Sequence, residues 1–418
     1  MNNCRRREDC RLCGSRSLER VCVLAPTPPA NAFISPAVKE KAQDAYPLEL
    51  NLCADCGHVQ LGHVVDPSLL FSNYVYVSGT SPSFVAHFET YAKTLWSISG
   101  AKPGDLAVDI GSNDGTLLRA FRSLGAEIQG VDPAQKIAME ANAAGIPTII
   151  DFFSQATAET ITAERGKAKI VTANNVCAHI DNLGGVISGV RDVLETDGIF
   201  VFEVSYLLDV LEHTLFDTIY HEHLDYHAVR PLRDFLKSQG FALFHVERIA
   251  SHGGSIRVFA ALFEAGRSVS EDVTNLIQLE EKAGLFDLAA YSKLTAQIAE
   301  AGDRLTAEIS AAKHAGRRIA GYGAPAKATT LMHQFGLTNT DIEYIVDDSP
   351  WKQGLLSPGL NVPIFASSQL EQQPVDDVIV LAWNFADPII ENNKLFLTGN
   401  RRFIVPLPNL RMVSADDF

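Results

Sequence analysis

The sequence lacks several features that would place the protein in a specialised class. No window approaches the roughly 18 consecutive apolar residues that a membrane span requires, and the N-terminal stretch MNNCRRREDC has no apolar segment of the kind found in secretory signals. Basic residues are not in excess: 35 Lys and Arg face 50 Asp and Glu, and the net charge of −15 would repel a nucleic-acid backbone. We therefore expect a cytoplasmic protein with no nucleic-acid or membrane partner.

What is present is the composition of an ordinary folded protein. The 418 residues are 46% hydrophobic and 20% charged, which is typical of globular chains. This length exceeds what one hydrophobic core supports, so we expect several domains. The patterns described below divide the chain into residues 1–75, 76–268, 269–315 and 316–418. No pattern fixes an oligomeric state, and a monomer is the working expectation.

Four of the seven cysteines form two pairs near the N-terminus, CRLC and CADC. Cysteines of a cytoplasmic protein stay reduced, so paired spacing indicates a metal or redox site. A glycine follows each pair and lets the backbone turn tightly enough for N–H groups to face sulfur. We predict a structural zinc site, with a redox CxxC as the alternative, although the gap between the pairs is longer than in common zinc ribbons. The expected ligands are Cys10, Cys13, Cys53 and Cys56.

From about residue 84 onward, short apolar strands alternate with amphipathic helices. The first strand is expected at 106–111, and the segments FALFHVERI and SIRVFAALF should form an antiparallel hairpin at one edge of the sheet. Alternation of this kind predicts a mainly parallel α/β sheet with helices on both faces. Residues 270–315 are helical in pattern, and a second strand–glycine–helix unit follows them.

The first strand ends in VDIGSNDGTLL, which places Asp109, Gly111, Asn113 and Gly115 before a helix. Ligands of open α/β sheets bind at this carboxyl edge. A dinucleotide fingerprint would have glycine where Asn113 stands, so that the backbone could approach a pyrophosphate. The acid-x-Gly-x-x-x-Gly form resembles instead the first motif of class I S-adenosylmethionine (SAM) methyltransferases. We therefore predict SAM rather than NAD as the ligand.

The next strands supply the remaining expected contacts to this cofactor. Asp132 ends the second strand and is placed to accept the ribose hydroxyls, a role that would suit NAD equally well. Asp151 and Phe152 follow the third strand and are placed to meet an adenine, and Asn174 ends the fourth strand. The alternative interpretations are a core position for Phe152 and a strand-end cap for Asn174.

A polar cluster, YHEHLDYH at 220–227, stands in the long connection between IFVFEVS and the helix PLRDFLKSQG. A strand-to-helix connection opens at the same sheet edge as the SAM turn, and long loops in compact domains usually carry function. The zinc motif H-E-x-x-H is not met, because Asp225 stands where its second histidine is required. We predict a proton-transfer role. A metal site on His221 and His223, or a polar loop without chemistry, are the alternatives.

Several segments together resemble the SAM-dependent nucleotide-sugar C-methyltransferases: CRLCG with CADCG, VDIGSNDGTL, YHEHLDYH, GGSIRV and GYGAPAKATTL. The resemblance covers nearly the whole chain. It implies an α/β protein in which a class I SAM methyltransferase (Rossmann-like) domain is flanked by a small zinc-binding module and a C-terminal Rossmann-like α/β domain. The implied reaction, in deoxysugar biosynthesis, is methyl transfer to the carbon beside the keto group of an NDP-4-keto-deoxyhexose.

The resemblance also implies roles for individual residues. His223 is the expected base that removes the proton beside the ketone, since histidine titrates near neutral pH, and His221 remains the alternative. The same resemblance implies residues that orient the base, contact the sugar or line the pocket: Glu222, Tyr220, His179 and Tyr74, with Tyr76 as the alternative to the last.

The segment GYGAPA forms a second glycine turn, with Gly321 and Gly323, and Asp347 and Asp348 end the next strand. On spacing, this turn matches a dinucleotide fingerprint better than the first one does, which supports an NAD-dependent nucleotide-sugar oxidoreductase or epimerase as the alternative function. The family resemblance implies instead that the turn, together with Lys327, faces the diphosphate of a sugar nucleotide. A non-catalytic protein that binds SAM or a nucleotide sugar is a further alternative.

Overall fold

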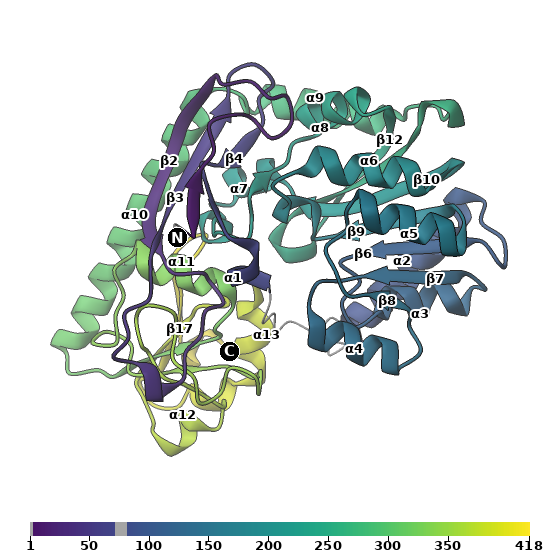
Figure 1. The fold of residues 1–418 in the computed structure, drawn as a ribbon. Helices are drawn as coiled ribbons and strands as arrows, with labels where there is room; N and C mark the ends of the chain where they lie inside the picture. The colour runs from purple at the N-terminus through teal and green to yellow at the C-terminus, as the bar shows by residue number, and fades with distance from the viewer. Residues whose placement is uncertain (1–2, 72–81) are drawn as a thin grey trace.

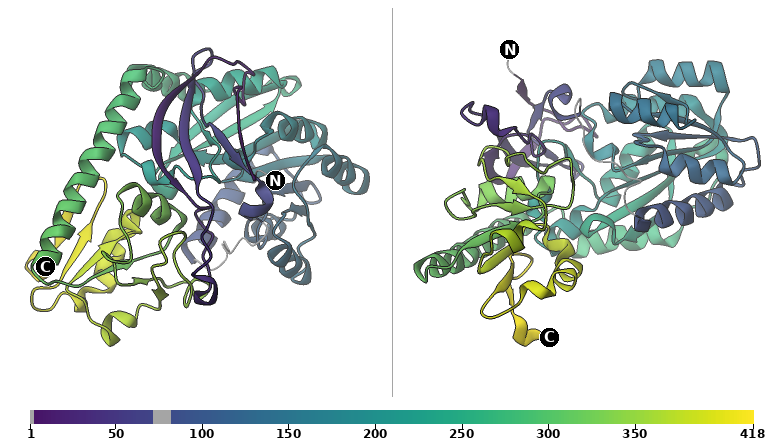
Figure 2. Two further views of the ribbon diagram at one scale, coloured as in Figure 1. Left: turned by 60° about the vertical axis from the view of Figure 1, so that its left-hand side comes forward. Right: turned by 90° about the horizontal axis from the view of Figure 1, so that it is seen from below.

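The computed structural model describes residues 3–71 and 82–418 (Figure 1). Tyr74 and Tyr76 lie outside the described residues. Within these ranges the strands form a two-stranded, a four-stranded, a seven-stranded and a six-stranded sheet. The seven-stranded and six-stranded sheets occupy separate lobes, and the N-terminal strands lie alongside the long helix α10 (Leu288–His314) (Figures 1 and 2).

The N-terminal sheet includes a strand from a distant part of the chain. Its order is β11-β4-β3-β2, all antiparallel, and β1 pairs with β5 beside it. The elements are β1 (Cys4–Arg6), β2 (Leu18–Thr27), β3 (Tyr46–Cys53), β4 (Val59–Leu61), β5 (His63–Val65), α1 (Pro67–Phe71) and β11 (Asp225–Tyr226). Because β11 is part of the YHEHLDYH segment, this segment joins the sheet of the cysteine-rich module instead of staying within the second domain.

The seven-stranded sheet has the order β12-β13-β10-β9-β6-β7-β8. β13 runs antiparallel to both neighbours, and the other pairings are parallel. The expected hairpin is therefore present, but its second strand lies inside the sheet and its first strand forms the edge. The strands are β6 (Leu106–Ile110), β7 (Glu127–Val131), β8 (Thr148–Ile149), β9 (Ala168–Asn174), β10 (Leu194–Ser205), β12 (Phe241–Ile249) and β13 (Ser255–Leu262).

Helices cover both faces of this sheet, as the alternating pattern predicts. Successive residues of a strand point to opposite faces, so Ile170 of β9 packs in a core with α2 and α3, and Val171 packs in another with α5 and α6. The helices are α2 (Pro82–Ser99), α3 (Thr116–Ser123), α4 (Gln135–Ala143), α5 (Gln155–Arg165), α6 (Leu183–Val193), α7 (Leu207–Glu212) and α8 (Val229–Ser238), with short 3₁₀ turns η3 (Cys177–His179) and η4 (Phe216–Thr218).

Two helices, α9 (Glu271–Lys282) and α10, lead to the C-terminal sheet. Its order is β16-β15-β14-β17-β18-β19, parallel except for β19. The elements are β14 (Ile319–Tyr322), α11 (Ala326–Gln334), β15 (Ile345–Val346), β16 (Ile364–Phe365), α12 (Gln369–Gln372), β17 (Asp377–Val380), α13 (Ala386–Asn392), β18 (Arg402–Val405) and β19 (Arg411–Val413). Although α10 spans 27 residues, no helix in the described part of the chain is long and apolar enough to cross a membrane.

Candidate active site

The four paired cysteines converge into one cluster. The Sγ atoms of Cys10 and Cys56 are 3.6 Å apart, as are those of Cys13 and Cys53, and all four sulfurs lie within 4.8 Å of one another. Tetrahedral zinc–thiolate bonds of about 2.3 Å separate neighbouring sulfurs by roughly 3.8 Å. The spacing and the all-thiolate donor set therefore fit a structural zinc ion.

The glycine after each cysteine pair takes the tight turn that the sequence predicts. Gly14 and Gly57 have φ of 74° and 81°, in the left-handed region that favours glycine. Their N–H groups donate to the carbonyl oxygens of Cys10 and Cys53 at 2.9 and 2.8 Å. A Cβ at Gly57 would lie 2.5 Å from Phe286 Cδ1, so the glycine also allows the connection between α9 and α10 to approach the cluster.

The turn after β6 is held in place by the acid at the end of β7. Asp132 Oδ2 accepts from the Asn113 N–H and Oδ1 from the Ala134 N–H, each at 2.8 Å. Asn113 has φ of 51°, a left-handed conformation that asparagine tolerates better than most residues. A Cβ at Gly111 would lie 2.3 Å from Val176 Cγ2. The turn thus needs glycine at 111 and accommodates asparagine where a dinucleotide site has its second glycine.

Buried polar atoms surround this turn. Thr172 Oγ1 donates to Asp109 Oδ1 at 2.6 Å, and burial raises the pKa of Asp109 to about 7 and also raises that of Asp132. Ser112 Oγ and Asn174 Nδ2 are buried and have no hydrogen-bond partner among the described residues. Buried polar groups of this kind usually have partners, so the site fits a ligand with its own polar groups, as the amino-acid and ribose parts of SAM have.

The two alternative interpretations at the rim of this site are not supported. Phe152 is 48% exposed, and it is the neighbouring Phe153 that packs in the core. Asn174 Oδ1 accepts from Tyr91 OH of α2 at 3.1 Å, a side-chain partner and not a backbone N–H. Asp151 is exposed next to Phe152, so both side chains are accessible at the edge where an adenine is expected.

Within YHEHLDYH, the position of the ring protons of His223 follows from its partners. Nδ1 lies 2.8 Å from the carbonyl oxygen of Thr218, which can only accept, so Nδ1 carries the proton. Nε2 then presents its lone pair, and it accepts from Tyr220 OH at 2.9 Å. His223 and Tyr220 are both partly exposed. A histidine held this way can take a proton at Nε2.

His221 is oriented differently from His223. Its side chain is fully buried, and Nε2 lies 3.2 Å from the carbonyl oxygen of Tyr46 on β3. Burial lowers the pKa of His221 to about 4. The two histidines therefore have separate partners and do not form a shared metal site, and only His223 combines partial exposure with a proton-accepting nitrogen.

A second imidazole lies next to His223. The ring centroids of His179 and His223 are 5.1 Å apart, and His179 also stacks on Phe71 at 5.7 Å. Burial, with a smaller contribution from His223, lowers the pKa of His179 well below its usual value. His179 is therefore neutral at physiological pH. Its ring lies beside that of His223, as the family resemblance implied.

Glu222 is held by a residue that sequence reasoning missed. Its side chain is 3% exposed, and Oε1 accepts from Asn31 Nδ2 at 2.8 Å. Burial raises the pKa of Glu222 to about 7. Asn31 follows the proline-rich PTPPA loop, which was the only local signal that this segment has a fixed conformation. The N-terminal module therefore contributes a side chain directly to this cluster.

Helix α11 of the C-terminal lobe contacts both the segment before Asn31 and the segment before Tyr220. Thr329 Oγ1 donates to the carbonyl oxygen of Ala30 at 2.9 Å, and Thr330 Oγ1 donates to that of Ile219 at 3.0 Å. Lys327 Nζ lies 4.9 Å from the ring centroid of Trp383. The segment preceding Tyr220 therefore lies where the three parts of the chain meet.

Contacts within the protein explain the residues of the glycine turn after β14. Gly323 has φ of 87°, and a Cβ there would lie 2.5 Å from Ala382 Cβ. Asp347 Oδ2 accepts from the Ala324 N–H at 2.6 Å and lies 3.6 Å from Lys352 Nζ. These contacts account for Gly323 and Asp347 without a bound dinucleotide, so the spacing alone does not indicate NAD.

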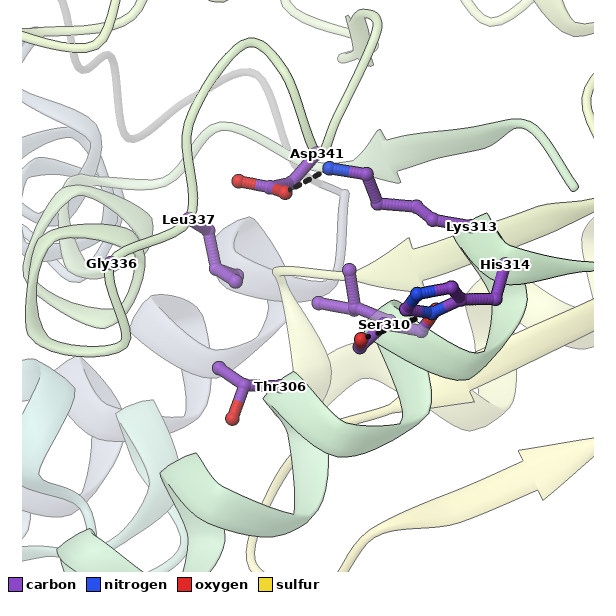
Figure 3. A pocket seen from close by; sticks show the side chains of 8 residues that line it. Thr306, Ser310, Lys313, His314, Gly336, Leu337 and Asp341 are labelled. Carbon is purple, nitrogen blue, oxygen red and sulfur yellow. Dashed lines mark hydrogen bonds and ion pairs between the residues drawn. The ribbon is translucent and has the colours of Figure 1, made fainter. Parts of the chain in front are cut away.

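A pocket of about 390 Å³ lies between α10 and the segment that follows α11 (Figure 3). Its lysine, Lys313, pairs with Asp341 at 2.6 Å, and His314 Nδ1 donates to the carbonyl oxygen of Ser310 on its own helix. None of its lining residues belongs to the His179–His223 cluster. The pocket is therefore separate from the site that contains His179 and His223.

Comparison with known proteins adds independent findings. Three family models match along the chain: a zinc binding domain at residues 10–71, a methyltransferase domain at 88–246 and a C-methyltransferase C-terminal domain at 250–408. C-methyltransferase NovU of Streptomyces niveus is 34% identical over 409 residues, which cover 98% of this chain and 97% of that protein.

Solved structures of methyltransferases are similar to part of the chain. Magnesium protoporphyrin IX methyltransferase (ChlM) from Synechocystis PCC 6803 with bound SAH is 19% identical and covers 42% of this chain and 84% of its own, with a TM-score of 0.33. An S-adenosylmethionine-dependent methyltransferase from Clostridium acetobutylicum is 13% identical and covers 43% and 92%, with a TM-score of 0.35.

Proposed function

Because this chain belongs to the family of SAM-dependent C-methyltransferases, we propose that it methylates the carbon beside the keto group of an NDP-4-keto-deoxyhexose. The observation that carries the proposal is the tautomer of His223, whose Nδ1–H is fixed by Thr218 and whose Nε2 accepts from Tyr220 OH. A C–H beside a ketone can be removed when a base is held close and the enolate oxygen is stabilised.

The proposed reaction begins at His223. Nε2 takes the proton, the C–H electron pair forms the enolate, and the enolate carbon forms the new C–C bond. When substrate replaces the Tyr220 hydroxyl at Nε2, that hydroxyl can donate to the enolate oxygen or orient the sugar. His179 and Glu222 complete the pocket, the former neutral and the latter with a pKa of about 7. Tyr74, outside the described residues, remains an expected member of it.

SAM supplies the methyl group, and the electron pair of its broken S–C bond stays on sulfur. The residues that would hold it stand at the carboxyl edge of the seven-stranded sheet: Asp109, Gly111, Asn113, Gly115, Asp132, Asp151, Phe152 and Asn174. Support comes from the buried Ser112 Oγ and Asn174 Nδ2, which have no partner in the described part of the chain, and from the left-handed turn that Asp132 fixes. Metal chemistry is not required for methyl transfer from a sulfonium, and the zinc ion is proposed to be structural.

The substrate's diphosphate is proposed to bind at the start of α11. The N–H groups of Gly321 and Gly323 donate to the carbonyl oxygens of Tyr344 and Val346 at 2.8 and 2.7 Å, so the two glycines would only give the diphosphate room to approach. The N–H groups of the first turn of α11 and the positive charge of Lys327 would bind it. This site supports the proposal because α11 is bonded to Ile219, directly before Tyr220. A sugar nucleotide anchored at α11 would therefore extend towards the His179–His223 cluster.

The test is hydrogen exchange into the substrate. The purified protein is incubated with a panel of NDP-4-keto-6-deoxyhexoses in heavy water, with S-adenosylhomocysteine or without it, and the deuterium is located by mass spectrometry and NMR. We expect exchange at one carbon beside the ketone, and methylation of the same carbon once SAM is added. Absence of exchange and of methylation with every sugar would contradict the proposed substrate class, and oxidation or epimerisation that depends on NAD would support the alternative.

A further inference from the structure

Arg11 lies between the two cysteines of the first pair and reaches out of the cluster to two separate loops. Its side chain is fully buried. Nε donates to Asp181 Oδ1 at 3.1 Å, and Nη1 lies 3.9 Å from Asp225 Oδ1. Asp181 comes two residues after His179, and Asp225 comes two residues after His223. One guanidinium therefore contacts both loops that carry the neighbouring imidazoles.

Backbone hydrogen bonds connect the same parts. The Leu224 N–H donates to the carbonyl oxygen of Ala178 at 2.7 Å, which ties the two loops to each other. The Leu224 carbonyl oxygen accepts from the Leu61 N–H of β4 at 2.9 Å and from Arg11 Nη1 at 3.2 Å. The residues that follow each histidine are thus fixed by the N-terminal module.

The second cysteine pair makes a matching contact. His58, two residues after Cys56, has Nε2 2.7 Å from Asp225 Oδ1, and both side chains are fully buried. Each cysteine pair therefore directs one side chain, Arg11 or His58, to the same carboxylate. When the four thiolates are held together, the backbone that carries these two side chains is held with them.

We propose that Arg11 is a positioning residue that couples the cysteine cluster to the His179–His223 pair, an inference that rests on the proposed function of these histidines. Guanidinium is planar and always charged, and its donors have a fixed geometry, so it can set the separation of the groups it bonds. Replacing outer-shell residues that orient metal ligands typically costs about 10- to 100-fold, and we expect an effect of the same size from a residue that orients the two imidazoles.

The competing explanation is that Arg11 only contributes to folding. Removing one partner of a buried ion pair destabilises a protein in any case. If Arg11 is a positioning residue, its replacement should make the loops at 177–182 and 220–227 more mobile and should slow proton removal. Zinc content and cofactor affinity should not change. These readouts separate the two explanations.

The experiment compares Arg11→Gln with Arg16→Gln in the full-length protein. Arg16 is an exposed arginine of the same module and serves as the matched control. Zinc content is measured by elemental analysis, S-adenosylhomocysteine affinity by calorimetry and backbone protection by hydrogen–deuterium exchange with mass spectrometry. The rate of deuterium incorporation into the keto sugar is the catalytic readout.

For Arg11→Gln we expect unchanged zinc content and cofactor affinity, faster exchange at 177–182 and 220–227, and proton removal slower by about 10- to 100-fold. Arg16→Gln should match the wild type throughout. Unchanged protection of the two loops, or an unchanged rate of proton removal, in Arg11→Gln would overturn the proposal.

If Arg11→Gln loses zinc or does not fold, Asp181→Asn is the second variant, because it keeps the shape of a partly exposed side chain and removes its charge. It should slow proton removal and loosen 177–182 with zinc retained, and wild-type behaviour in both respects would overturn the proposal. A wild-type protein that acts on no keto sugar would contradict the proposed function alone, since the protection of the two loops still tests the role of Arg11.

Discussion

Tyr220 OH donates to His223 Nε2 at 2.9 Å, and the opposite ring nitrogen donates to the Thr218 carbonyl oxygen. The Tyr220 hydroxyl is thus hydrogen-bonded to the nitrogen of His223 that takes the proton in the proposed reaction. Nε2 is kept as an acceptor in the resting protein, and the group that occupies it is itself a donor suited to an enolate oxygen.

Replacement of His223 by alanine should abolish the base and leave the pocket open. We expect methyl transfer to fall by roughly 100- to 10,000-fold, the usual contribution of general acid–base catalysis. Deuterium incorporation into the sugar should fall in parallel, while S-adenosylhomocysteine binding is unchanged. His213→Ala, which removes an exposed histidine directly after α7, is the control and should retain full exchange. Full turnover in His223→Ala would rule out this histidine as the base.

Glu222 should make the protein less stable as pH rises. Burial raises its pKa from 4.5 to about 7 in the folded protein. Between these values the unfolded chain has released this proton and the folded chain still binds it, so this contribution to the free energy of unfolding decreases with pH. One pKa unit corresponds to about 1.4 kcal/mol, which allows a loss of up to about 3 kcal/mol.

Glu222→Gln isolates this effect, because glutamine stays neutral and can still accept from Asn31. We expect the unfolding midpoint of the wild type to fall more than that of Glu222→Gln between about pH 5 and about pH 8, measured by thermal unfolding. Identical pH dependence in the two proteins would show that Glu222 has no such role.

Lys327 should matter for substrate affinity more than for chemistry. If its ammonium contacts the diphosphate, Lys327→Ala should raise the KM for the sugar nucleotide by about tenfold, the value of one hydrogen bond to a charged group. The KM for SAM should not change. Lys313→Ala is the control, since Lys313 lies in the pocket on α10 and pairs with Asp341. An unchanged KM for the sugar nucleotide in Lys327→Ala would place its diphosphate elsewhere.

The cysteine cluster should bind about one zinc ion per chain. Cys53→Ser, or removal of the metal by a chelator, should increase hydrogen–deuterium exchange at 177–182 and 220–227, because Arg11 and His58 lie next to the ligands. S-adenosylhomocysteine affinity should be retained, since its predicted site lies on the seven-stranded sheet. Cys4→Ser is the control, because Cys4 is outside the cluster. A fully metallated Cys53→Ser would exclude the predicted ligand set.

The sequence by itself determined the local features of this protein. Paired cysteines followed by glycine predicted the two turns that Gly14 and Gly57 adopt, because only glycine takes positive φ without cost. Short apolar runs that alternate with amphipathic helices predicted the parallel sheets, since strands buried on both faces are uniformly apolar. Asn113 in place of glycine separated SAM from NAD as the expected ligand of the first turn. Each signal depends on neighbouring residues only.

Tertiary structure alone decided how these pieces meet. The sequence could not distinguish His221 from His223, because their difference depends on how β3 of the N-terminal module packs against His221, whose Nε2 lies 3.2 Å from the carbonyl oxygen of Tyr46. It gave no sign that Asn31 reaches Glu222 or that Arg11 reaches both loops. The strands β11 and β16, each of two residues, were too short to show a period. Contacts between residues far apart in the chain depend on how whole elements pack, and no local pattern encodes that.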